Sequence, residues 1–219
     1  LRFFLCNLQC DGFMQTDPTD PSTYDLPYQE INPDDYETLE DLPVFEKGCD
    51  SSYSWSKKFK SLQRSGTAEE IANRIVNMMK NESNPKGLFQ HPNGVWQHMC
   101  FTGGEPLMNH GQKAVPEILE VFKNLEGKGD TPKSIGNTPK SITFETNGTQ
   151  PLTPEFIEFF NTYKFTGELF WSISPKLETV SGEKRSKAIK PDILKMYRML
   201  SRHGQLKFVM GTEERQWEE

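Results

Sequence analysis

The sequence has no run of about 18 to 20 consecutive apolar residues, the length that a membrane-spanning helix needs. Its first residues, LRFFLC, lack the charged start and the small-residue cleavage site of a signal peptide. The four cysteines could form two disulfides, but a chain of 219 residues can bury a full core without them. These observations predict a cytoplasmic protein without a membrane span, whose thiols stay reduced or bind metal.

Basic residues are absent from one long stretch. Residues 11–46 contain eleven Asp or Glu, five Pro and no Lys or Arg. The net charge of the whole chain is −6, so the remaining 25 basic and 20 acidic residues give +5 elsewhere. Such a composition is typical of a polar loop and not of a core element. We interpret residues 11–47 as an acidic, proline-rich insertion that forms a peripheral lid or a partner surface, because its charge resists burial.

Short apolar strands alternate with amphipathic helices along the rest of the chain. Strands are expected at residues 2–5, 98–102, 142–146, 169–174 and 206–210. Helices are expected at residues 67–80, 112–125 and 190–202, with another beginning at Pro154 and a last one beginning within residues 211–219. Residues 127–140 are expected to be a linker-like loop. Repeated strand–helix–strand units predict parallel strands with helices packed outside, in an open sheet or in a partial or full barrel.

The unusual residues of the sequence follow the predicted strands. In chain order they are Cys6 and Cys10, the run Thr102-Gly103-Gly104-Glu105-Pro106, the run Glu145-Thr146-Asn147-Gly148, and the run Ser174-Pro175-Lys176. Taken singly, the Gly-Gly pair is equally well explained by a turn, and the Asn-Gly pair is better explained by a turn than by a site. Together they favour a site, because ligands of parallel α/β folds lie at the carboxyl ends of the strands.

Cys6 and Cys10 have a spacing that can hold a soft metal, but two thiolates need a third ligand. Cys49, in GCDSSYSW, can return to the pair if residues 11–48 bulge out as a loop. Enlarging that gap to 38 residues costs roughly 2.6 kcal/mol of loop entropy. Thiolate metal binding is worth about 10 kcal/mol or more, so the loop does not forbid the site. Three cysteines on a four-iron cluster would leave one iron open to a small molecule.

The remaining candidate metal ligands are less persuasive. Cys100 lies within a predicted strand and is expected to be a buried, inert thiol. The histidines have no metal-ligand spacing and are expected to be surface or capping residues; they are His91, His98, His110 and His203.

The segments RFFLCNLQC, CDSSYSW, TGGEP, FETNGT, SPK and LKFV, in this order, resemble the radical S-adenosylmethionine superfamily. The resemblance spans nearly the whole chain and is closest to the 7-carboxy-7-deazaguanine synthase family. It implies one domain over residues 1–219, a partial (incomplete) TIM-like barrel of parallel strands with outer helices and the insertion inside the cluster loop. The implied reaction converts 6-carboxy-5,6,7,8-tetrahydropterin to 7-carboxy-7-deazaguanine with loss of ammonia, in queuosine and 7-deazapurine biosynthesis.

The resemblance also implies a role for individual residues. Cys6, Cys10 and Cys49 would ligate a [4Fe-4S] cluster, whose open iron would bind S-adenosylmethionine and cleave it to a 5′-deoxyadenosyl radical. The S-adenosylmethionine site would be lined by Asp50, Gly104, Glu105, Glu145, Ser174 and Lys176. Arg2 would pair with the substrate carboxylate, Thr102 would hydrogen-bond the pterin, and Ser51 would ligate Mg²⁺. No side chain is assigned as a catalytic acid or base.

Further implications concern partners and the ends of the chain. The resemblance implies an electron donor such as flavodoxin or ferredoxin and a homodimer. Because Lys and Arg do not cluster, we expect a small anionic substrate and no direct nucleic-acid binding. The family's Gln-Gly-Glu-Gly segment would precede residue 1 and a C-terminal segment would follow LKFV, so we expect a chain trimmed at both ends.

Two other functions remain open at the level of sequence. One is a different radical S-adenosylmethionine enzyme, such as a glycyl-radical activating enzyme, which shares the cluster and the Gly-Gly-Glu-Pro motif but acts on a protein. The other is a non-catalytic zinc-binding protein with a four-thiolate site of Cys6, Cys10, Cys49 and Cys100.

Overall fold

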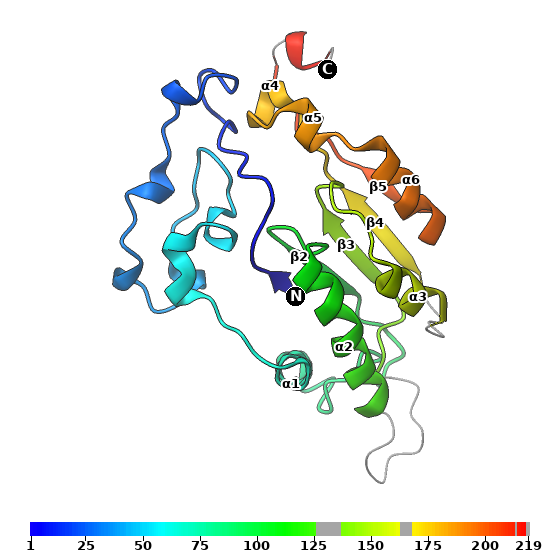
Figure 1. Ribbon diagram of the computed structural model, residues 1–219. Coiled ribbons are helices and arrows are strands. Elements are labelled where there is room, and N and C mark those ends of the chain that lie inside the picture. Colours follow the sequence, from blue (N-terminus) through cyan, green and yellow to red (C-terminus); the bar gives the residue numbers. More distant parts are fainter. Residues whose placement is uncertain (126–136, 163–167, 213, 218–219) are drawn as a thin grey trace.

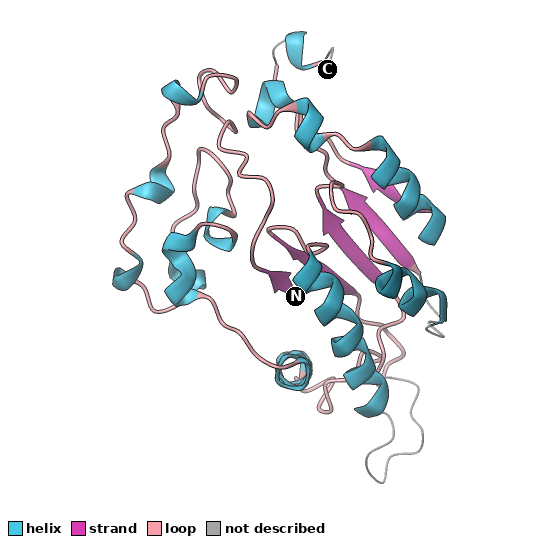
Figure 2. Ribbon diagram, in the orientation of Figure 1, coloured by secondary structure: helices cyan, strands magenta, loops and turns pink. Residues whose placement is uncertain are grey.

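The computed structural model describes residues 1–125, 137–162, 168–212 and 214–217. Its centre is a five-stranded sheet with helices packed against it (Figures 1 and 2). All neighbouring strands are parallel, and their spatial order β1-β2-β3-β4-β5 follows the chain. Within the described residues β1 and β5 are not paired with each other, so the sheet is open. The strands are β1 (Arg2–Phe3), β2 (Met99–Gly103), β3 (Ile142–Thr146), β4 (Leu169–Ile173) and β5 (His203–Leu206).

One face of the sheet forms the main core. Side chains alternate between the two faces of a strand, and the register places Phe101 beside Phe144 and Phe144 beside Trp171. The ring centroids of Phe101 and Phe144 are 5.2 Å apart, and those of Phe144 and Trp171 are 5.3 Å apart. All three side chains are almost fully buried. These aromatic rings join the three central strands under the helices.

Four longer helices cover this face: α1 (Ala68–Met79), α2 (Asn109–Leu125), α3 (Pro154–Thr162) and α6 (Pro191–Leu200). Their apolar stripes match the expected 3.6-residue period, with Ile118, Phe122, Phe156 and Tyr197 fully buried. Two short helices, α4 (Glu178–Ser181) and α5 (Arg185–Ala188), connect β4 to α6. The expectation of parallel strands with outer helices is therefore confirmed, as an open sheet.

The ends of two helices follow their sequence signals. Thr67 caps α1. Its hydroxyl accepts a hydrogen bond from the amide of Glu70 at 3.2 Å, and the Glu70 carboxylate accepts one from the amide of Thr67 at 2.8 Å. This reciprocal pair is the capping box that the sequence predicts. Thr153 accepts from the amide of Phe156 at 3.2 Å, so α3 begins at Pro154 as expected.

The prediction for the C-terminal strand is wrong. The sequence predicts a strand at residues 206–210 after a helix at 190–202, but β5 runs from His203 to Leu206. A side-chain β-carbon on Gly204 would lie 2.7 Å from the backbone oxygen of Trp171. Gly204 is thus a strand residue that lets β5 lie close to β4, and α6 ends at Leu200.

Other boundaries also differ from the expectations. The first strand ends at Phe3 because Leu5 has a φ of 69°, outside the extended region. The described residues near the C-terminus form one 3₁₀ turn, Glu214–Gln216, where a helix was expected. Most of the expected linker at 127–140 lies outside the described residues.

The insertion at residues 11–47 shares a small core with the residues that follow it. Its backbone forms separate 3₁₀ turns, including Pro27–Gln29 and Pro33–Asp35. Tyr28 and Phe45 are buried against Phe59, although all three lie away from the sheet. Figure 1 shows the blue insertion beside the cyan segment that follows it. The interpretation as an entirely polar loop is therefore corrected: the aromatic side chains turn inward while most of the acidic side chains stay exposed.

No helix in the described part of the chain combines the length and the apolar character that a bilayer crossing requires.

Candidate functional site

The three cysteines predicted to bind metal lie together. Cys6, Cys10 and Cys49 are free thiols that share one small apolar cluster with Leu8 and Ala188. Cys6 and Cys10 follow β1, and Cys49 returns to them from the far side of the insertion. The base of the insertion is closed by a hydrogen bond from the amide of Gly48 to the carbonyl of Phe13, at 2.8 Å. This bond explains how 38 intervening residues leave Cys49 beside the pair.

Burial dominates the acidity of these thiols. Desolvation raises the pKa of Cys6 to about 11 and raises the pKa of Cys10 and of Cys49 above the ordinary value. The positive charge of Lys176 acts in the opposite direction at all three sulfurs, but it is outweighed. The metal-free thiols are therefore protonated at neutral pH, and a bound metal would have to displace their protons.

The cysteines are not arranged for one small ion. Among the described residues, no group of three or more His, Cys, Asp or Glu side chains is gathered as the ligands of a single metal ion would be. In an iron–sulfur cluster each thiolate binds a different iron, so the sulfurs stay farther apart than around one ion. Which metal group the three thiols would bind therefore remains a prediction.

The Gly103-Gly104 pair packs directly against the cysteine loop, which we define as residues 5–10. The amide of Gly104 donates to the carbonyl of Phe3 at 3.1 Å, and the amide of Glu105 donates to that of Leu5 at 2.8 Å. A β-carbon on Gly104 would lie 2.2 Å from the oxygen of Leu5. Gly104 is glycine because the cysteine loop runs across it, and Gly103 is glycine because a β-carbon there would lie 2.2 Å from the oxygen of Phe3 in β1.

Glu105 is fully buried and already hydrogen-bonded. Its carboxylate accepts from the amide of Leu107 at 2.9 Å, from the hydroxyl of Thr146 at 2.8 Å and from the amide of Asn147 at 2.8 Å. Burial raises the pKa of Glu105 to about 7, although these hydrogen bonds act in the opposite direction. The side chain therefore ties the end of β2 to the end of β3. A direct contact of this carboxylate with S-adenosylmethionine remains a prediction.

Asn147 links β3 to the cysteine loop, a role that sequence reasoning missed. Its side-chain amide donates to Asn7 Oδ1 at 3.0 Å and lies 3.8 Å from the sulfur of Cys6. Asn7 in turn donates to Thr149 at 2.9 Å. The FETNGT motif contains the signal that could have identified Asn147. An Asn-Gly pair after a strand is, however, more simply explained as a turn.

Polar side chains occupy the face of the sheet opposite the helices. Thr102 donates to Glu145 at 3.0 Å, and the ammonium of Lys207 lies 3.7 Å from the same carboxylate. Cys100 shares this face and is half-exposed, which corrects the expectation of a buried thiol. Sequence reasoning did not identify Lys207 as a site residue, since its place beside Glu145 depends on the pairing of β5. We call this surface the open face.

Arg2 and Ser51 meet at the edge of the open face. The guanidinium of Arg2 donates to Ser51 Oγ at 3.3 Å and to the carbonyl of Gly103 at 3.2 Å, and it lies 5.8 Å from the centre of the Tyr53 ring. Ser51 donates to Asp50 at 3.0 Å. In this arrangement the Ser51 oxygen faces a cationic side chain, so its assignment to Mg²⁺ remains a prediction.

Ser174 and Lys176 complete the predicted set. The amide of Ser174 donates to the carbonyl of Thr146 at 2.8 Å, which places the end of β4 beside that of β3. Lys176 donates to Ser174 Oγ at 3.2 Å, and its ammonium lies 5.5 Å from the centre of the Phe13 ring. Lys176 thus brings a positive charge to the cysteines, as its influence on their acidity shows.

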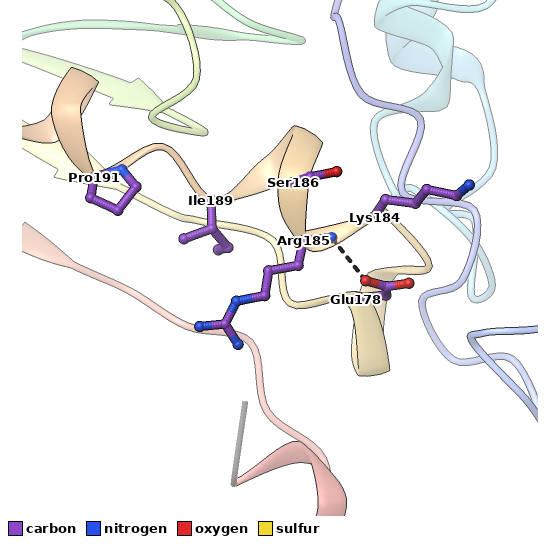
Figure 3. Close-up of a pocket in the computed structure, with 6 residues that line it drawn as sticks. All are labelled: Glu178, Lys184, Arg185, Ser186, Ile189 and Pro191. Atoms are coloured by element: carbon purple, nitrogen blue, oxygen red, sulfur yellow. Dashed lines mark hydrogen bonds between the residues drawn. The ribbon is translucent and has the colours of Figure 1, made fainter.

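A separate cavity of about 570 Å³ lies along the segment that joins β4 to α6 (Figure 3). Its walls contain none of the candidate site residues described above; they are Glu178, Lys184, Arg185, Ser186, Ile189 and Pro191. We base the candidate site on the cysteines and the strand ends, because the reactive side chains gather there and not in this cavity.

Comparisons of the chain with protein-family models, with curated proteins and with solved structures give no match. The functional interpretation accordingly depends on the residues and their geometry.

Proposed function

We propose that this protein is a radical S-adenosylmethionine enzyme that converts 6-carboxy-5,6,7,8-tetrahydropterin to 7-carboxy-7-deazaguanine with loss of ammonia. The observation that carries the proposal is the return of Cys49 to Cys6 and Cys10, at the carboxyl edge of a parallel sheet, across a long insertion. In this proposal the open sheet is a partial TIM-like barrel and the radical S-adenosylmethionine core. An electron donor such as flavodoxin or ferredoxin and a homodimer belong to the same proposal.

The cysteine cluster has the chemistry that an iron–sulfur group requires. Three free thiols are held in apolar surroundings, and soft thiolates select iron–sulfur clusters. Cys6, Cys10 and Cys49 would hold a [4Fe-4S] cluster, which supplies the electron that cleaves S-adenosylmethionine. Lys176 would offset part of the negative charge of the three thiolates.

The strand ends beside the cysteines would bind S-adenosylmethionine. Asp50, Glu145, Ser174 and Lys176 would supply charges of both signs and a hydroxyl, which suits a zwitterionic amino acid. The Glu105 carboxylate is engaged with Leu107, Thr146 and Asn147. Glu105 would therefore act mainly by holding β2 and β3 in place, while Gly103 and Gly104 let the chain approach the ligand closely.

The open face would receive the pterin. No described carboxylate forms an ion pair with Arg2, so its planar guanidinium is available to pair with the substrate carboxylate. Thr102 lies on β2 within this face, where its hydroxyl oxygen can accept a hydrogen bond from an N–H group of a pterin while it donates to Glu145. Ser51 and Asp50 provide the hard oxygens that a Mg²⁺ ion beside that carboxylate would need.

The position of Cys100 argues against it as the fourth ligand of the zinc alternative. Cys100 precedes Gly104 by four residues along β2, about 13 Å at the rise of an extended strand. The pKa of Cys100 responds to Glu145, Lys207 and Arg2, whereas that of Cys6 responds to Cys49 and that of Cys10 responds to both Cys49 and Cys6. The glycyl-radical activating alternative shares the cluster and differs in substrate, so it is separated by assay.

Anaerobic reconstitution of the full chain with iron and sulfide tests the proposal. We expect about four irons per chain, reductive cleavage of S-adenosylmethionine, and conversion of the carboxylated tetrahydropterin to a product with the mass of 7-carboxy-7-deazaguanine. Retention of zinc without iron would overturn the cluster. Cleavage of S-adenosylmethionine without that product would overturn the substrate and favour a protein-activating enzyme.

An Arg2→Ala variant sharpens the substrate assignment. Because Arg2 is exposed and lies outside the main core, this variant should bind iron as the wild type does while the KM for the pterin rises at least tenfold. Equal KM values for the two proteins would contradict the role assigned to Arg2.

A further inference from the structure

Glu183 lies against the cysteine loop although about 170 residues separate it from Cys10 in the chain. Its carboxylate is largely buried, with 8% of the residue exposed. One oxygen accepts from the amide of Gln9 at 2.5 Å and from the amide of Cys10 at 3.0 Å. The other oxygen forms an ion pair with Lys187 at 2.8 Å. A single acidic side chain therefore fixes two successive amides of the cysteine loop.

The backbone of Cys10 needs such support. Its φ is +57°, a left-handed conformation that a residue with a β-carbon adopts at a cost. The segment that carries Glu183 also contacts the loop, and the residues just after it, at two further points. The amide of Gly12 donates to the carbonyl of Ser181 at 3.0 Å, and Ala188 is buried against Leu8 and Cys10.

The hydrogen bonds to Glu183 are of the stronger kind, because the acceptor is charged. One oxygen accepts from the two amides and the other pairs with the ammonium of Lys187 at 2.8 Å, an arrangement that suits a charged carboxylate. Hydrogen bonds to a charged acceptor are roughly twice as strong as neutral ones. The anion can thus hold a backbone conformation that the sequence of the loop does not favour.

We propose that Glu183 is a positioning residue that presets Cys10 for metal binding, acting through the amides of Gln9 and Cys10. The identity of the bound group rests on the proposed function above, whereas the backbone contact does not. This role differs from that of the cysteine ligands, because no atom of Glu183 would bind the metal.

Amide hydrogen exchange in the metal-free, full-length protein tests the contact directly. In Glu183→Ala we expect the amides of Gln9 and Cys10 to exchange at least about tenfold faster than in the wild type, the loss expected for hydrogen bonds to a charged group. Glu183→Gln keeps one acceptor oxygen without the charge and should show an intermediate rate. Exchange in Glu183→Ala at the wild-type rate would overturn the proposal.

Glu178→Gln is a matched control from the same segment. Its carboxylate accepts from the amide of Arg185 at 2.9 Å (Figure 3), so the variant weakens an equivalent contact that does not involve the cysteine loop. We expect wild-type exchange at Gln9 and Cys10 in this variant. Acceleration equal to that of Glu183→Ala would show a general loosening of the segment and would overturn the specific role of Glu183.

Anaerobic reconstitution then measures the consequence for metal binding. Glu183→Ala should retain less than half of the wild-type iron, Glu183→Gln an intermediate amount, and Glu178→Gln the full amount. Full iron in both Glu183 variants would overturn the positioning role. If Glu183→Ala does not fold, the amide exchange rates and the iron content of Glu183→Gln test the proposal instead. A wild type that binds no iron would refute the proposed function, while the exchange rates would still report on the contact with Cys10.

Discussion

Phe144 and Glu145 are neighbours in β3, yet they belong to different regions of the molecule. Phe144 is fully buried under the helices and contacts the rings of Phe101 and Trp171. Glu145 is exposed on the open face, where it meets Thr102 and Lys207. Strand alternation alone produces the difference, since successive side chains point to opposite faces.

The comparison shows how the sheet separates stability from chemistry. The helix-covered face buries large apolar side chains, and their removal from water supplies most of the stability. The open face carries polar groups whose exposed ion pairs contribute little to folding. Side chains on the open face can therefore change without unfolding the protein. The cysteine loop belongs to neither face and lies at the edge, where the strands end.

The largest expected effect concerns the cysteines at the edge. Cys49→Ala should abolish iron binding after anaerobic reconstitution, because it removes one of three thiolates. Cys100→Ala, a thiol removed from the open face, should leave the iron content and the visible absorbance of the cluster intact. Iron analysis and absorbance spectra of the two variants check this, and the reverse pattern would show that Cys100 is the third ligand.

A second test compares the adjacent residues of β3. Phe144→Ala should lower the free energy of unfolding by about 3–5 kcal/mol, because it leaves a cavity among packed rings. Glu145→Gln should change it by no more than about 0.5 kcal/mol, as for other surface substitutions. Urea unfolding of the metal-free protein measures both. Similar losses in the two variants would contradict the separation of the two faces.

The smallest expected effect is a pH dependence from the end of β2. The pKa of Glu105 is raised by burial to about 7 from an ordinary 4.5, so the folded protein binds its proton more tightly than the unfolded chain. The resulting stabilisation is full below pH 4.5 and is lost as the pH rises through 7. Between pH 5 and 8 the wild type should lose about 2–3 kcal/mol more than Glu105→Gln.

Urea unfolding of both metal-free proteins at the two pH values measures this difference. Because Glu105→Gln cannot titrate at this position, the comparison isolates the contribution of one carboxyl group. Parallel pH profiles of the two proteins would show that Glu105 does not hold the raised pKa in solution.

Local sequence signals predicted much of the fold. The capping box of Thr67 and Glu70, the start of α3 at Pro154 and the bounds of β3 all follow from residues within a few positions of each other. Such signals report short-range hydrogen bonds and side-chain period, which neighbouring residues determine. The error at β5 has the opposite origin, since Gly204 is explained by the backbone of Trp171, more than 30 residues away.

The candidate site was predicted in part. The position of its residues after strands, and the possibility that Cys49 returns, followed from strand order and from the low entropy cost of a long loop. The inward turn of Tyr28 and Phe45 could not be predicted, because the acidic composition around them favours a solvated loop. The links made by Asn147 and Lys207 also depend on which strand ends meet.

By itself, the sequence determined the alternation of strands and helices, the polar character of the residues at the strand ends and the presence of three thiols available for one site. Only the tertiary structure decided that Glu183 supports Cys10, that Glu105 joins β2 to β3 and that Cys100 lies apart from the other thiols. The physical reason is the separation along the chain of the residues that interact. Local conformation depends on residues a few positions apart, whereas the surroundings of a buried carboxylate or thiol are set by segments that meet only when the whole chain packs.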